Sequence, residues 1–177
     1  MPLAAHRSAQ TLREQFDRGF ALALAPPVGG SLNVLIIRIG SERFAVALPD
    51  IQGLYVDRTI LALPSPMPEL LGVANFRGQI VPVYQLASLI GKTGAAAPRW
   101  MVLVQERAPL AFAFDAFEAH LCAGARQLLA GSERAVAEQA FDAVHTENGV
   151  VPLLPVRTLA GQIAERTAGP GPGGGHG

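Results

Sequence analysis

The only cysteine of the chain, Cys122, lies two residues after His120. If this stretch is a β-strand, both side chains lie on one face, as a nucleophilic thiol and its base require. No neighbouring residue is placed to orient the imidazole, so packing or simple surface exposure is the better interpretation of both. We therefore expect no catalytic residues and no enzyme.

Sites for metals and phosphates also lack their sequence patterns. The four histidines are scattered and no second cysteine accompanies them, so no metal site is predicted. Gly29, Gly30 and Ser31 precede a predicted strand, and no Gly-Lys-Ser/Thr follows them, which argues against a phosphate-binding loop. We expect no cofactor, and this absence favours a protein that acts by binding.

Arg77 is the residue best suited to recognition. It stands in the run Asn75-Phe76-Arg77-Gly78, and the glycine favours a turn with positive φ that pushes the guanidinium outward. A presented arginine can bind carboxylate or carbonyl groups of a partner. The residues alone leave open the alternative that Arg77 is an ordinary solvated turn residue.

The composition limits the partners. Half of the 177 residues are hydrophobic, enough for one substantial core or two small abutting ones. Fourteen basic residues balance fourteen acidic ones and form no basic run, so we expect no nucleic-acid partner. No charged segment followed by a long apolar run opens the chain, and Pro26 and Pro27 break the apolar stretch 21–35. We expect a cytoplasmic protein without membrane insertion.

An amphipathic helix is predicted near the N-terminus. Thr11 and Glu14 form a capping-box pattern, and Leu12, Phe16 and Phe20 then make one apolar stripe. The stripe can dock on the body of this chain or on a partner, and the sequence does not decide between them.

The rest of the chain has the period of β-strands. Two hairpins, whose side chains alternate along each strand, are predicted over residues 32–48 and 100–114, and a short strand is predicted over 60–63. Asn148 and Gly149 form the dipeptide favoured in type I′ turns, between two further strands. Short strands at such intervals are typical of a small barrel or sandwich.

An internal similarity indicates a duplication. Residues 79–91 match residues 149–161 in apolar pattern, in a proline (Pro82, Pro152) and in a closing glycine, although chance agreement is possible in so apolar a chain. Each copy is expected to be a strand, about one helical turn and a glycine stop. The expected domains are a helix and linker over 1–30, two sub-barrels over 31–94 and 95–166, and a disordered Gly/Pro tail over 167–177.

The segment around Arg77 resembles the CheW family, whose members read closely as Leu-Pro-x-x-Pro and then Gly-Val-x-Asn-Leu-Arg-Gly-x-Ile-Val-Pro-Val. The resemblance is strong over 32–91, moderate over 100–117 and weak from there to 161. The matching residues are Leu63-Pro64, Pro66 or Pro68, Gly72-Val73, Asn75 to Gly78 with Phe76 in place of leucine, and Ile80 to Val83.

The resemblance implies a mainly β fold of two SH3-like five-stranded barrels that share an apolar seam. It also implies a non-enzymatic adaptor that joins the cytoplasmic tip of a methyl-accepting chemoreceptor to the regulatory domain of a CheA-type histidine kinase. By the same resemblance, Arg77, Asn75 and Gly78 lie at or near the contact surface, and Ile51 and Leu54 face partners across an apolar patch.

Some residues depart from the family pattern and leave alternatives open. The family places an aspartate after Val-Pro-Val, where this chain has Tyr84, and a glutamate two places after Ile51, where it has Gly53. A divergent scaffold of a non-chemotaxis signalling system is therefore the second interpretation. A small β-barrel hydrolase or ligand-binding protein that uses Cys122 and His120 is the third.

Overall fold

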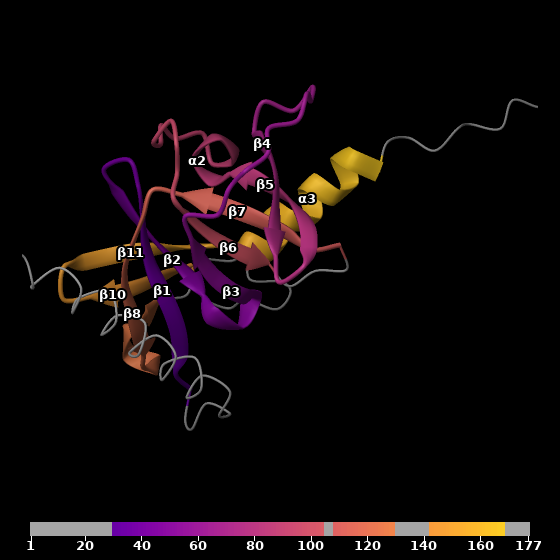
Figure 1. Ribbon diagram of the computed structural model, residues 1–177. Helices are drawn as coiled ribbons and strands as arrows, with labels where there is room; N and C mark the ends of the chain where they lie inside the picture. The colour runs from indigo at the N-terminus through magenta and orange to yellow at the C-terminus, as the bar shows by residue number, and fades with distance from the viewer. Residues whose placement is uncertain (1–29, 105–107, 130–141, 169–177) are drawn as a thin grey trace, which may run out of the picture.

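The computed structural model describes residues 30–104, 108–129 and 142–168. It contains two β-sheets and a few helical segments, of which the C-terminal helix α3 is the longest (Figure 1). The amphipathic helix expected near the N-terminus lies outside the described residues. Of the disordered tail expected over 167–177, residues 167 and 168 instead end the C-terminal helix, and residues 169–177 lie outside the described part of the chain. None of the helices in the described ranges has the length and apolar character needed to cross a membrane.

One sheet has six strands and the other has five. The six-stranded sheet has the order β8-β1-β2-β11-β10-β9, and the five-stranded sheet has the order β3-β6-β7-β5-β4. The bounds in the first sheet are β1 Leu32–Ile39, β2 Glu42–Ala47, β8 Ala116–Ala123, β9 Leu128–Leu129, β10 Ala143–Thr146 and β11 Gly149–Leu154. Those in the second are β3 Ile51–Val56, β4 Leu70–Phe76, β5 Gln79–Gln85, β6 Trp100–Val104 and β7 Leu110–Phe114. The helical segments are η1 Leu48–Asp50, α2 Leu86–Leu89, η2 Ala125–Gln127 and α3 Val156–Ala168.

The two sheets have the same strand plan when the two-residue strand β9 is set aside. In each, an antiparallel hairpin (β1–β2 or β6–β7) has one antiparallel neighbour and one parallel neighbour. The parallel neighbours are β11 beside β2 and β5 beside β7. These are the two strands whose sequences match each other, so the duplicated pattern corresponds to a duplicated structural element.

The two sheets do not correspond to the two halves of the chain. The expected sub-barrels covered residues 31–94 and 95–166, whereas the strands of each sheet come from both sides of that boundary. β5 from the first half completes the sheet of the β6–β7 hairpin, while β11 from the second half completes the sheet of the β1–β2 hairpin. β3 and β8 cross over in the same reciprocal manner. Each sheet is therefore built from both halves of the sequence, and neither half contains a complete sheet.

Large and small side chains alternate on the central hairpins. On β7, Leu110, Phe112 and Phe114 face a core shared by both sheets, whereas Ala111 and Ala113 face the interior of the five-stranded sheet. On β2, residues 44 and 46 are large and face the shared core, and residues 45 and 47 are alanines that face the interior of their own sheet. Small residues on the concave side let each sheet curl tightly, while the large ones fill the space between the sheets.

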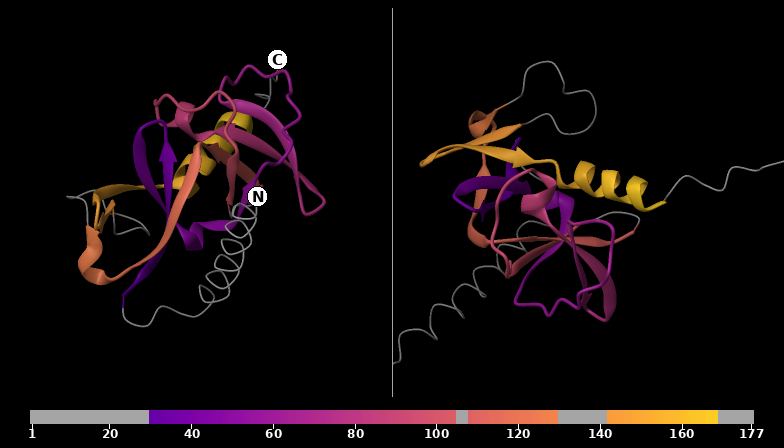
Figure 2. Two further views of the ribbon diagram at one scale, coloured as in Figure 1. Left: turned by 60° about the vertical axis from the view of Figure 1, so that its left-hand side comes forward. Right: turned by 90° about the horizontal axis from the view of Figure 1, so that it is seen from above.

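The shared core, called the seam core below, also receives residues from α2 and α3. It confirms the predicted apolar seam between two small sheets of a mainly β fold. From the end of β11, α3 runs along the five-stranded sheet (Figure 2). The members buried below one tenth exposure include Leu35, Ile37, Val46, Leu86, Val102, Val104, Phe112, Phe114, Leu154 and Ile163.

The helix α3 is longer than the single turn expected before a glycine stop. It runs for 13 residues through Gly161, because Val156, Ala160 and Ile163 bury one face of it in the seam core. Tertiary packing of this kind outweighs the cost of about 1 kcal/mol for a glycine inside a helix. The first copy of the repeat, residues 79–91, agrees better with the predicted single turn and glycine stop, because α2 is one turn long and Gly91 follows it with φ +66°.

Asp115 connects the two sheets through backbone hydrogen bonds. Its carboxylate accepts bonds from the N–H of Gly40, in the β1–β2 turn, at 2.6 Å and from the N–H of Ala95 at 2.9 Å. The structure therefore assigns Asp115 a structural role.

Residues 60–63, predicted as a strand, form only an isolated bridge between Leu61 and Val73.

Substitution of Gly72 tests how much the bridge between Leu61 and Val73 contributes to stability. It follows a bulge in β4, has φ +143°, and a Cβ atom there would clash with the Leu61 carbonyl. We expect Gly72→Ala to lower the free energy of unfolding by more than about 1 kcal/mol. Gly161→Ala, where the added methyl meets open space within a helix, should instead raise it by up to about 1 kcal/mol. Equal effects in urea unfolding would contradict this assignment.

The ion pair between α3 and the loop before β4 predicts a pH dependence. A hydrogen bond from its own backbone N–H, and then the Arg166 guanidinium at 3.2 Å, hold the pKa of Glu69 below its ordinary value. Because the folded-state pKa is the lower one, the carboxylate stabilises the fold above the ordinary value of 4.5, and this contribution is lost as the pH falls through the folded-state pKa. Unfolding free energies measured from about pH 6 to pH 3 should fall less steeply in Glu69→Gln than in the wild type. Arg166→Gln should give an intermediate slope, and identical slopes in all three proteins would contradict the prediction.

Candidate functional site

The β4–β5 hairpin carries the sequence singled out for recognition. Phe76 pairs with Gln79, so Arg77 and Gly78 are the two turn residues. Their φ values are +53° and +86°, the pattern of a type I′ turn. The expected positive φ at Gly78 is confirmed. The β10–β11 turn differs from the type I′ turn predicted at Asn148–Gly149: Thr146 pairs with Gly149, so the turn residues are Glu147 and Asn148, and neither has a positive φ.

Asn75 braces this turn. Its side-chain oxygen accepts a hydrogen bond from the backbone N–H of Gly78 at 2.8 Å. Phe76, which is 2% exposed, anchors the strand below and meets the ring of Tyr55 edge-on with centroids 4.9 Å apart. The Arg58 guanidinium lies over the Tyr55 ring, 5.3 Å from its centroid. The exposed tip therefore stands on a well-packed base.

Arg77 itself is exposed, and within the described residues it takes part in no ion pair. A positive φ is costly for a residue with a long side chain, and asparagine or glycine would serve a type I′ turn at lower cost. The backbone here holds a free guanidinium outward at the end of the hairpin, which projects from its sheet (Figure 1).

An apolar patch lies on the outer face of the same hairpin. Val73 pairs with Pro82, and Leu61 bridges Val73 on the other side, so these three side chains form one row. Ile80 belongs to the same face, since its neighbours Val81 and Val83 point into the core. Leu61 is 67% exposed and Ile80 63%. We call Leu61, Val73, Ile80 and Pro82 the hairpin patch.

Ile51 does not lie on such a patch, whereas Leu54 is only partly covered and its contact with a partner stays a prediction. Ile51 is 5% exposed and belongs to the seam core, and Leu54 is half-buried against that core. The expectation that Ile51 faces partners is corrected by its burial between the sheets. The hairpin patch was missed in the sequence, although the alternation of Ile80 and Pro82 with Val81 and Val83 was visible. Alternation separates two faces but does not show which one is covered.

His120 and Cys122 are both exposed on β8, and no hydrogen bond joins them within the described chain. Although His120 as a whole is exposed, neighbouring atoms shield its imidazole from part of the solvent, and this desolvation lowers the pKa of His120 and disfavours a charged imidazole. Among the described residues, no cluster of three or more His, Cys, Asp or Glu could hold a metal ion.

Asp57 is held by Arg99 through contacts of 2.7 and 2.6 Å, and this guanidinium keeps the Asp57 pKa below its ordinary value.

The brace by Asn75 gives a direct prediction. Asn75→Ala removes the acceptor for the Gly78 N–H and should reduce the free energy of unfolding by about 0.5–1.5 kcal/mol. Amide hydrogen exchange of Gly78 should become faster, while Asn75→Asp, which keeps an acceptor oxygen, should preserve slow exchange. If exchange at Gly78 is equally slow in Asn75→Ala, the turn does not depend on this bond.

The comparisons with known proteins agree with this geometry. The family model of the CheW-like domain matches residues 33–163. The crystal structure of the scaffolding protein TtCheW from Thermoanaerobacter tengcongensis superposes with a TM-score of 0.60, covering 72% of this chain and 91% of that one at 16% identity. No curated protein matches the chain. The match covers most of the described residues, including both sheets and the Arg77 turn, and the chain therefore belongs to the CheW-like domain family.

Proposed function

We propose that this chain is a non-enzymatic adaptor that couples the cytoplasmic tip of a methyl-accepting chemoreceptor to a CheA-type histidine kinase. The observation that carries the proposal is Arg77, held outward on a strained and braced turn beside the hairpin patch. Membership in the CheW-like family supports a scaffold role, and the similar solved structure is described as a scaffolding protein.

The hairpin has the two parts that a protein–protein contact needs. Ile80 and Leu61 supply exposed apolar area, and an apolar patch bordered by polar groups is typical of an interaction site. Arg77 adds a directional group at the rim, where a guanidinium can bind a carboxylate through two parallel hydrogen bonds. The patch supplies affinity and the arginine fixes the register of the partner.

The interior of the seam between the two sheets is already filled by this chain's own side chains, so a partner can contact only its outer surface. Phe112, Phe114 and Leu35 in the seam core are at most 1% exposed, and α3 covers the core with Ile163. A receptor helix would therefore lie along the surface and would not insert between the sheets. We assign the kinase contact to the hairpin, and the receptor contact to the surface beside the seam.

A second candidate is a CheW-like scaffold of a non-chemotaxis signalling system, and Gly53 favours it. A Cβ atom at this position would lie 2.9 Å from the ring of Tyr55, so a glutamate could not take the place of Gly53 without moving that ring. Tyr84, where the family pattern has an aspartate, is 4% exposed in the seam core, and burial raises its pKa. Both departures are accommodated by the packing of this chain, so the two acidic groups of the family pattern are missing from it, and this loss favours a different partner.

Charge reversal at Arg77 tests the proposal. With a purified CheA-type regulatory domain, Arg77→Glu should weaken binding at least about tenfold, or 1.4 kcal/mol, because a partner carboxylate would then meet a like charge. The melting temperature should stay unchanged, since Arg77 makes no ion pair within the described chain. Arg126→Glu, at an exposed arginine of η2, is the matched control and should bind as the wild type does.

Affinity capture from the native cytoplasm separates the two candidates. Recovery of a CheA-type kinase and a chemoreceptor by the wild type but not by Arg77→Glu supports the first. Recovery of a different signalling protein, lost in the same variant, supports the second. Equal recovery by the wild type and Arg77→Glu would remove this hairpin from the contact surface.

A further inference from the structure

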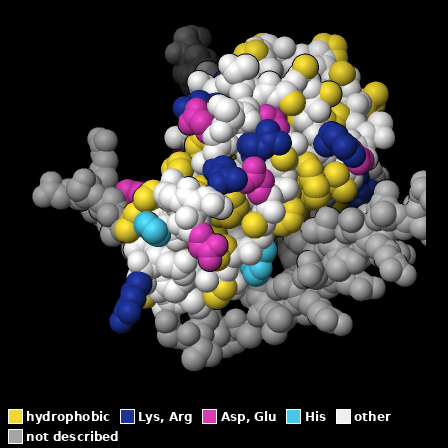
Figure 3. Space-filling view, turned by 90° about the vertical axis from the view of Figure 1, so that its left-hand side faces the viewer, with side chains coloured by type: hydrophobic (Ala, Val, Ile, Leu, Met, Phe, Trp, Pro, Cys, Tyr) yellow, Lys and Arg dark blue, Asp and Glu magenta, His cyan; other side chains and the backbone are white. Residues whose placement is uncertain are grey.

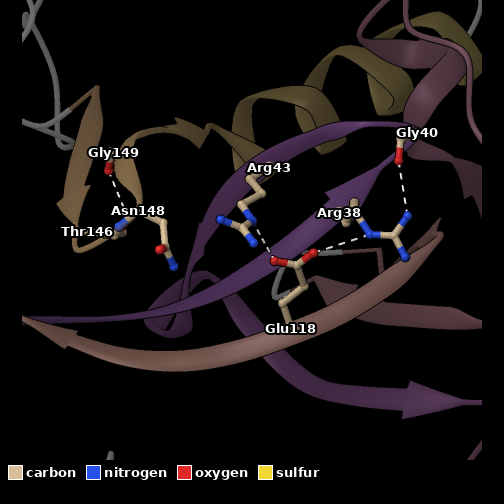
Figure 4. Close-up of polar contacts among 7 residues, drawn as sticks. All are labelled: Arg38, Gly40, Arg43, Glu118, Thr146, Asn148 and Gly149. Carbon is tan, nitrogen blue, oxygen red and sulfur yellow. Dashed lines mark hydrogen bonds and ion pairs between the residues drawn. The ribbon is translucent and has the colours of Figure 1, made fainter.

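A second polar cluster lies on the six-stranded sheet. Arg38 of β1 and Arg43 of β2 are directly opposite each other in the hairpin, an arrangement in which like charges repel. Glu118 of β8 lies between them and contacts both, with 2.7 Å to Arg43 Nε and 3.2 Å to Arg38 Nε (Figure 4). One carboxylate therefore serves two guanidinium groups.

A β-bulge brings Glu118 to this position. Ile36 pairs with Ala119 and Ile37 pairs with Phe117, so Glu118 is an extra residue without a partner in the ladder. Bulges of this kind redirect a side chain, and they are frequent beside functional sites. The bulge interrupts an otherwise regular strand at the one residue that compensates the two arginines.

The cluster borders a shallow depression of about 460 Å³. Arg38, Arg43 and Glu118 form one side, and the β10–β11 hairpin forms the other with Asn148, Val150 and Pro152. Val150 is 57% exposed. Figure 3 shows this face, on which basic and acidic side chains lie close together beside apolar surface. The depression thus combines a charged wall with an apolar rim.

The charged wall has an excess of one positive charge. Glu42, also at the depression, is bound by Lys92 at 2.7 and 3.0 Å, so its charge is already compensated. Glu118 uses one oxygen for each arginine. Arg38 gives one further hydrogen bond, to the Gly40 carbonyl at 3.2 Å. A guanidinium has five N–H donors, so the pair retains donors for another anion.

We propose that this depression is a docking site for an acidic segment of a protein partner. A glutamate or aspartate of the segment binds Arg43 and Arg38 beside Glu118, and an adjacent aliphatic side chain packs on Val150 and Pro152. The net positive charge and the exposed valine at its edge select this occupant. The site lies in the six-stranded sheet, away from the Arg77 hairpin, and it does not depend on the adaptor function proposed above.

The probe for this site is an end-blocked, fluorescently labelled peptide of alternating glutamate and leucine, titrated with the full chain at low ionic strength. The same peptide with glutamine in place of glutamate is the control ligand. Fluorescence anisotropy should show saturable binding of the acidic peptide alone, and added salt should weaken it because screening acts on exposed charges.

Variants of the cluster should change the affinity in opposite directions. Arg43→Gln should weaken binding at least about fivefold because it removes a charge-assisted contact, whereas Glu118→Gln should strengthen it about threefold because it removes the internal competitor. Arg126→Gln, the matched charge change on η2, should have no effect. Thermal unfolding of each variant ensures that only folded proteins are compared.

Three results would overturn the proposal. The first is equal affinity for the glutamate and glutamine peptides. The second is an equal effect of Arg43→Gln and Arg126→Gln, which would indicate nonspecific attraction to surface charge. The third is the absence of saturable binding at about 1 mM acidic peptide, equivalent to less than about 4 kcal/mol of binding free energy.

Discussion

The two central hairpins each present large side chains on one face and alanines on the other, and their large faces meet. Phe44 and Val46 of β2 face Phe112 and Phe114 of β7 across the seam core, which also receives one face of α3. Because burial of such side chains contributes about 1.5–3 kcal/mol each, this contact provides much of the driving force for folding. The positions of both surface sites follow from it, since each lies on strands whose inner faces are held by these cores.

Reciprocal exchange of strands strengthens this dependence. β5 and β11 each cross to the sheet built on the other half's hairpin, and β3 and β8 do the same. A sheet therefore forms only when distant parts of the chain have met, and disruption of either half of the sequence removes strands from both sheets. The arrangement suits a scaffold, because the relative position of surfaces on the two sheets is fixed by the backbone itself.

Both surface sites have the same construction, a polar group presented by an irregular backbone above a packed base. Arg77 stands on a turn with two positive φ values, braced by Asn75 and supported by Phe76. Glu118 stands on a bulge between Arg38 and Arg43. Such local irregularities are costly and persist where the surrounding structure holds them, which is why they are informative about function.

The sequence by itself determined the local elements and the family. The period of two and the repeated strand with its proline were sufficient to predict the hairpins and the duplication, because each is a pattern readable along the chain. The run around Arg77 gave the resemblance to the family, and the apolar seam was predicted only through that resemblance. Tertiary structure alone decided which strands pair across the halves, the burial of Ile51, the length of α3, and the meeting of Glu118 with Arg38 and Arg43. These depend on contacts between residues far apart in the chain, and a pattern of alternation separates the two faces of a strand without showing what covers each one.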